Sequence, residues 1–280
     1  MSLVLKFSKA ARPAEMHFVD HLEVLRGHIT RSLLAILVCS IVFFIYRDWM
    51  FDNIITGPIN ADFITYRLLC SFSNWIHAGN ALCMPPVEVS MQTTSFSGQF
   101  VSSISMAITG GFIVAFPYVF HELWRFVKPA LKPSEIKGTN LVVLGVSACF
   151  FIGSAFGYFL LGPFTFNFLA GYHVGNNMML VTRPTLTDYL ENLTSLILGC
   201  GLAFELPVLA YVLTKAGLIT PGLLKSSRRY AYVSILVISA VITPSPDWMS
   251  QLIVFLPLLF LYELSIIISN RLLKRVVSGQ

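Results

Sequence analysis

Charged residues are scarce in this sequence. Asp, Glu, Lys and Arg make up 12% of its 280 residues, whereas soluble domains contain about 25%. Hydrophobic residues make up 55%, and the mean hydropathy is +0.73. This balance excludes an ordinary soluble domain and indicates an integral membrane protein folded as one compact bundle.

Recognisable catalytic motifs are also lacking. The sequence has no GxxxxGK[ST] phosphate loop, no HExxH zinc motif, no GxSxG nucleophile turn and no GxGxxG dinucleotide loop. Its six histidines are scattered, and no Cys and His residues are spaced as metal ligands. We therefore expect neither an enzyme nor a bound cofactor or metal.

The apolar residues gather in six segments, which predicts an all-α polytopic membrane protein. The fifth segment has 14 residues, or about 21 Å of helix, which is shorter than a hydrocarbon core of about 30 Å. A segment of residues 1–29 precedes the bundle, and a tail of residues 270–280 follows it. The predicted spans are residues 30–46, 98–120, 139–161, 190–214, 230–243 and 251–269.

The basic residues are sorted by these spans. All but three of the 19 Lys and Arg residues fall on one side, in the N-terminal segment, the second and fourth loops and the tail. The exceptions are Arg47, Arg67 and Arg183. Because Lys and Arg gather on the cytoplasmic side of membrane proteins, both termini are predicted to lie in the cytoplasm. The net charge of +5 therefore reports topology, and we expect no nucleic-acid binding.

The five cysteines form two groups. Cys39, Cys149 and Cys200 lie within predicted spans, where a free cysteine acts as a small packing residue. Cys70 and Cys83 share the long loop of residues 47–97, which the charge sorting places outside. Because the exterior is oxidising, a disulfide between these two is predicted.

Within the predicted fourth span, the apolar stretch Leu193–Thr214 carries one acidic or basic residue, Glu205. A carboxyl group within a bilayer costs at least roughly 2.5 kcal/mol. Pro207 has no N–H and leaves the carbonyl of Ala203 without its helical donor. The acid either bonds to a neighbouring helix for packing alone or forms a functional polar site. Glu263 in the sixth span lies at a similar depth, and the sequence leaves open whether the two acids share a cavity.

An apolar stripe precedes the first span. Phe18, Leu22, Leu25 and Ile29 fall on one face of a helix, and Asp20 and Glu23 lie together on another. Two interpretations remain. The segment is either an interfacial helix with a solvated acidic face or an acidic docking surface.

Several short motifs follow one another along the six spans. They are HLEVLR (His21–Arg26), Gly57-Pro58, PYVFHELWRFVKPALKPSE (Pro117–Glu135), AFELPV (Ala203–Val208), RRY before the fifth span, and TPSPDWMSQ followed by Pro257 and Tyr262-Glu263. In this order they resemble the TatC family, the multispanning subunit of the bacterial twin-arginine protein translocase. The resemblance runs from about Met16 to Leu272.

The resemblance implies a function. Proteins of this family recognise signal peptides with two adjacent arginines and help export folded passenger proteins across the cytoplasmic (inner) membrane. They work in an oligomeric complex with TatA-like and TatB-like single-span subunits, driven by the proton-motive force. Two guanidinium groups call for carboxylates, which accept bidentate hydrogen bonds.

The resemblance also assigns sites. Signal-peptide binding falls to the pre-span element and the second cytoplasmic loop, with Glu135, Glu23, Phe126 and Asp20 as the candidates. An intramembrane polar site for a partner helix falls to Glu205, Pro207, Glu263 and Gln251.

The sequence departs from the family pattern at two positions. Val24 occupies the usual Glu position of the pre-span element, with Glu23 one residue early, about 100° away on a helix. Glu122 stands where the family often has Gln, which adds an acid near the proposed patch. The alternative function is a proton-coupled secondary transporter of a small solute, since buried acids in broken helices suit ion coupling. The lack of an internal repeat argues against it.

Overall fold

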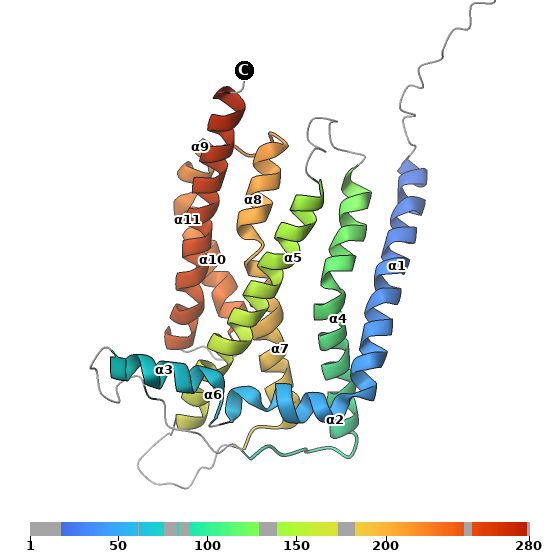
Figure 1. Ribbon diagram of the computed structural model, residues 1–280, viewed down its shortest axis with the longest axis vertical. Coiled ribbons are helices and arrows are strands. Elements are labelled where there is room, and N and C mark those ends of the chain that lie inside the picture. Colours follow the sequence, from blue (N-terminus) through green and yellow to red (C-terminus); the bar gives the residue numbers. More distant parts are fainter. Residues whose placement is uncertain are drawn as a thin grey trace, which may run out of the picture.

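The computed structural model describes residues 18–60, 62–75, 83, 90–128, 139–172, 183–243 and 248–278. Long helices stand side by side in this part of the chain (Figure 1). They are α1 (Phe18–Ile45), α4 (Gly98–Val127), α5 (Thr139–Phe156), α7 (Leu186–Ala203), α8 (Leu206–Lys215), α10 (Arg228–Ile242) and α11 (Trp248–Ser278).

Six stretches of the described chain cross the bundle. Five are long and apolar enough to span a membrane: Glu23–Ile45, Gly98–Val127, Val142–Gly171, Leu186–Lys215 and Gln251–Leu273. The sixth is α10, which has 15 residues and runs alongside the others (Figure 1). The predicted all-α polytopic fold is confirmed. Helix α10 lies where the short fifth span is predicted, and it is not among the five described helices that are long and apolar enough to span a membrane.

Two of these stretches are not single regular helices. After α5, the chain continues through the π-helical turn η4 (Gly157–Leu161) and then α6 (Gly162–Gly171). The fourth crossing consists of α7 and α8, with a break at residues 204 and 205. The short helix α9 (Pro221–Ser226) then leads into α10.

The first helix differs from the expected division at residue 30. The pre-span segment and the first span form one helix, α1, from Phe18 to Ile45. No proline interrupts this stretch and Gly27 is its one glycine, so nothing in the backbone ends the helix where the charged residues stop. Ile29, part of the expected apolar stripe, is exposed.

Helix α1 begins at one end of the bundle, and helices α4, α8 and α11 terminate there. We call this the basic end, because most of the described Lys and Arg residues lie near it. At the opposite end, short elements lie across the bundle (Figure 1). These are α2 (Arg47–Met50), η1 (Phe51–Ile55), η2 (Gly57–Ile59) and α3 (Ile64–Trp75). The predicted disulfide between Cys70 and Cys83 is present in this layer.

Close helix contacts depend on glycine. A Cβ at Gly111 of α4 would lie 2.6 Å from the backbone nitrogen of Ser40 on α1, and a Cβ at Gly157 would lie 2.5 Å from the carbonyl oxygen of Leu196 on α7. Both distances are well inside van der Waals contact, so these helices pack backbone to backbone, as small residues allow in membranes. Of the free cysteines, Cys200 is buried in the packed centre.

Candidate functional site

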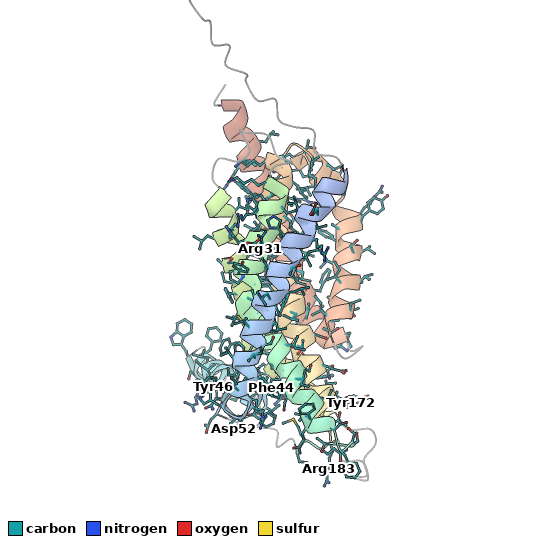
Figure 2. The ribbon with its side chains drawn as sticks, turned by 90° about the vertical axis from the view of Figure 1, so that its right-hand side faces the viewer. Arg31, Phe44, Tyr46, Asp52, Tyr172 and Arg183 are labelled. Atoms are coloured by element: carbon teal, nitrogen blue, oxygen red, sulfur yellow. A yellow bond between two sulfur atoms is a disulfide. The ribbon has the colours of Figure 1, made fainter. Side chains whose placement is uncertain are left out.

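Glu122 of α4 forms a charged cluster with α1 near the basic end. Its side chain is 2% exposed, and its carboxylate lies 2.6 Å from His28 Nδ1, 3.1 Å from Arg31 Nε and 3.4 Å from Arg125 Nη1. A buried carboxylate is tolerated only when it is paired and hydrogen-bonded. These contacts join α1 to α4, and Figure 2 labels Arg31 in the bundle.

The cluster changes the expectation for Glu122. The sequence suggested an additional acid available near the proposed patch. In the structure, its two oxygens accept hydrogen bonds from Arg31 and Arg125 and contact the His28 ring. Glu122 therefore holds the two helices together and has little capacity left for an external cation.

Phe126 lies one turn beyond Glu122 on α4 and is half-buried. Its ring meets the His28 ring edge-on, with 6.2 Å between the centroids. Val24 lies one turn before His28 on the same face of α1 and is exposed. A side chain at position 24 therefore points toward the surface beside Phe126.

Glu23 is exposed on α1, and no ion pair joins it to another described residue. It is rotated about 100° from Val24 around the helix, so it lies on a neighbouring face of α1. Asp20 lies in the first turn of α1, but its side chain lies outside the described part of the structure, as does the whole of Glu135. The structure thus brings Glu23 and Phe126 to the same end of the α1–α4 pair.

Glu205 occupies the break between α7 and α8. Its side chain is 6% exposed, and neither carboxylate oxygen has a hydrogen-bond partner among the described residues. Pro207 stands in the first turn of α8, where its missing N–H leaves the Ala203 carbonyl without the usual donor. The predicted helix break and the buried acid therefore coincide. The described residues do not support the interpretation that Glu205 serves packing alone through a hydrogen bond to a neighbouring helix.

An apolar groove runs beside this break. It has a volume of about 580 Å³ and is lined by side chains of α5, α8 and α11 together with Phe204. Phe204 and Pro207 both line it, so Glu205 lies between two lining residues. Cys149 and Gly145 of α5 form part of the opposite wall, and nothing lies within 4 Å of a Cβ built on Gly145.

Glu263 and Gln251 have partners within the chain. Arg228 Nη2 donates to Glu263 Oε2 at 2.7 Å, and the Tyr232 hydroxyl donates to Oε1 at 2.7 Å. Gln251 Nε2 donates to the Leu236 carbonyl at 3.1 Å. These bonds fasten α11 to α10. Among the described residues that line the groove beside Glu205, neither Glu263 nor Gln251 appears, so the structure does not bring the two acids into one cavity.

Comparison with known proteins decides the family. A family model described as Sec-independent protein translocase protein (TatC) matches residues 20–257. The chain belongs to the TatC family. The TatC of Blattabacterium sp. subsp. Periplaneta americana is 35% identical over 262 residues, covering 93% of this chain and 97% of that protein. The TatC of Aquifex aeolicus is 33% identical and covers 91% and 95%.

Solved structures agree with this assignment. A crystal structure titled as the twin arginine translocase receptor TatC has a TM-score of 0.66 and 30% identity, covering 90% of this chain and 98% of that one. A second, in DDM, has a TM-score of 0.69 and 31% identity, covering 89% and 99%. As a TatC-family member, the chain is a multi-pass membrane protein and a translocase subunit, which sets aside the solute-transporter alternative.

Proposed function

We propose that this protein receives twin-arginine signal peptides at the basic end of α1 and α4 and helps export folded passenger proteins across the bacterial cytoplasmic membrane. The observation that carries the proposal is the different environment of two acids near this end, Glu122 and Glu23. Glu122 is buried and paired within its own chain, whereas Glu23 is exposed at the same end of the α1–α4 pair as Phe126, without an ion pair to the described residues. A free carboxylate next to an aromatic ring suits a guanidinium ligand.

The proposed orientation puts the basic end in the cytoplasm, with both termini on that side. The described Lys and Arg residues at this end include Arg125, Lys215 and Arg228, and those at the opposite end are Arg47, Arg67 and Arg183. This sorting is the one expected for cytoplasmic and exported sides. A signal peptide arriving from the cytoplasm would then meet the surface of Glu23 and Phe126 first.

We assign the arginine pair to Glu135 and Glu23, with Asp20 beside Glu23. Arginine presents a planar fork that a carboxylate can accept in two parallel hydrogen bonds. Phe126 offers an aromatic face on which the flanking guanidinium or apolar side chains of the peptide can pack. Val24 has no charge to offer, so Glu135 carries the larger share of the binding in this chain.

We assign the groove beside Glu205 to a transmembrane helix of a TatA-like or TatB-like subunit within an oligomeric complex. A buried carboxyl without a partner is satisfied most simply by a polar group from another helix. Pro207 adds the free Ala203 carbonyl at the same depth. Glu263 and Gln251 act indirectly in this scheme, because their bonds to α10 hold α11 as one wall of the groove. No enzymatic step and no cofactor is needed.

Binding of a fluorescent twin-arginine peptide to the protein in lipid nanodiscs tests the proposal. Glu135→Ala should weaken binding by about 1.5–3 kcal/mol, the scale of hydrogen bonds to charged groups. Glu23→Ala should cost less because of its displaced position, and Val24→Glu should leave binding unchanged or strengthen it. Glu191→Ala, which removes an exposed acid from α7 near the opposite end, is the matched control. Unchanged affinity in Glu135→Ala would mean that the recognition site has been misplaced.

A further inference from the structure

Helix α3 presents three distinct faces around its circumference. With about 100° between successive residues, one face carries Thr65, Tyr66 and Ser73, which are all buried against the protein. The exposed remainder divides in two. Its apolar half consists of Ile64, Leu68, Phe72 and Trp75, which are 53%, 63%, 51% and 75% exposed. Its polar half consists of Arg67, Ser71 and Asn74, which are also exposed.

The contacts of the buried face tell which exposed half points toward the bilayer. The Thr65 hydroxyl donates to the carbonyl of Phe159. The Tyr66 hydroxyl donates to the carbonyl of Pro58 at 2.9 Å and lies 3.3 Å from the carbonyl oxygen of Pro163. From Phe159 to Pro163 the chain runs from the basic end toward the opposite end, so Phe159 lies deeper in the membrane than Pro163. The Thr65 edge of α3 therefore faces the bilayer interior, and the Tyr66 edge faces outward.

The apolar half of α3 adjoins the Thr65 edge, and the polar half adjoins the Tyr66 edge. Starting from Thr65 and moving around α3 away from the protein, the next residues are Phe72 and Leu68 of the apolar half. Starting from Tyr66 in the other direction, Cys70 comes first and Asn74 of the polar half comes next. Hence the apolar half lies on the bilayer side and the polar half on the outer side. The disulfide at Cys70 lies on the outer side too, where an oxidising compartment allows it.

The depth of α3 matches the edge of the hydrocarbon core. Figure 1 shows α3 lying across the bundle near the level at which α1 ends. The 20 residue-to-residue steps from Arg26 to Tyr46 correspond to about 30 Å of helix, the thickness of the core. Tyr46 and Trp49 at this level are 63% and 59% exposed, and such aromatic residues are typical of a membrane interface. Figure 2 shows Tyr46 at this end of the molecule.

We propose that α3 is an interfacial anchor whose apolar half, Ile64, Leu68, Phe72 and Trp75, inserts into the acyl-chain boundary of the outer leaflet. The occupant is lipid rather than protein because the apolar half lies on the bilayer side, at the depth of the interface, with a polar half beside it that faces water. A helix with these faces is stable in the plane of the interface, with its apolar side buried about 5–10 Å. The anchor is independent of signal-peptide binding, and it sets the height of the outer layer relative to the spans.

Tryptophan quenching in lipid vesicles tests the anchor. The protein has four tryptophans, and the variant Trp49→Phe, Trp124→Phe, Trp248→Phe leaves Trp75 as the reporter. The matched control adds Trp75→Phe and Ser71→Trp, which moves the reporter to the polar half one turn away. Phosphatidylcholine brominated on the upper acyl chain should lower Trp75 emission by about twofold or more, at the depth expected for such helices, while aqueous acrylamide should have little effect. The Ser71→Trp indole should respond in the reverse way.

The other outcomes overturn the proposal. Quenching of Trp75 by acrylamide would place the apolar half in water. Protection of Trp75 from both quenchers would mean that a second copy of the chain or another protein covers it, and quenching of both reporters by lipid would remove the division into two halves. As a test that needs no substitution, the unmutated protein is also treated with a phospholipid that carries a diazirine on its acyl chain. Its adducts should fall on Leu68, Phe72 or Trp75 and not on Arg67 or Asn74, and the opposite pattern would contradict the anchor.

Discussion

Removing the Glu122 carboxylate should loosen α1 from the rest of the bundle. Glu122→Ala leaves His28, Arg31 and Arg125 without the anion that now lies within 3.4 Å of each. Breaking a fully buried ion pair costs about 3–5 kcal/mol. Here the cost should be smaller, because the Arg31 and Arg125 side chains are 50% and 57% exposed and can turn to water. We expect a loss of about 1–3 kcal/mol in the free energy of unfolding.

Glu122→Gln separates hydrogen bonding from charge. The amide oxygen, in the place of Oε2, can still accept from Arg31 and face the His28 ring. The amide nitrogen then faces Arg125, whose side chain is 57% exposed and can turn to water, so the loss should stay below about 1.5 kcal/mol, the net value of an ordinary hydrogen bond. Unfolding in mixed micelles with increasing SDS measures both variants, with Glu191→Ala as the control. The same samples report twin-arginine peptide binding, which Glu122→Ala should weaken because Glu23 moves with α1. If Glu122→Ala behaves like the control in both assays, the cluster does not hold α1 in place.

Two further substitutions test the interior. Glu205→Gln keeps the shape and a donor, so it should retain much of the export activity and the crosslinking to a TatA-like or TatB-like helix. Glu205→Ala should lose about 0.6–2 kcal/mol of partner binding. Equal loss of export in both variants with unchanged crosslinking would contradict a docking role for Glu205. Gly111→Ala should destabilise the protein by about 1–3 kcal/mol, because the added methyl meets the backbone of α1. Gly145→Ala should not destabilise the protein, because Gly145 has open space around it. Similar unfolding curves for Gly111→Ala and Gly145→Ala would refute the close contact between α4 and α1.

The sequence was a good guide wherever one local rule controlled the outcome. Pro207 cannot donate a hydrogen bond, so a break near Glu205 followed from chemistry alone. The short helix α10 and the pairing of Cys70 with Cys83 followed from segment length and from the sorting of Lys and Arg. These features depend on neighbouring residues or on which side of the membrane a loop lies.

Other features depend on how distant helices are rotated against each other. His28 and Glu122 are 94 residues apart, and their pairing requires one particular rotation of α1 on α4. The same is true of Glu263, which looked like a second free acid until Arg228 and Tyr232 were found beside it. The three faces of α3 needed the contacts of Thr65 and Tyr66 before any direction could be assigned. No pattern within a single segment contains this information.

Site-specific photo-crosslinking tests the central claim most directly. A benzoylphenylalanine at Phe126 places the crosslinker on the proposed signal-peptide surface, and the same change at Phe96, which is fully exposed near the opposite end, is the control. We expect a peptide with two adjacent arginines to crosslink at position 126 and not at position 96. Replacing both arginines with lysine should abolish the crosslinked product, because lysine lacks the bidentate fork. Crosslinking at position 96 alone, or at position 126 regardless of the arginines, would contradict the central claim.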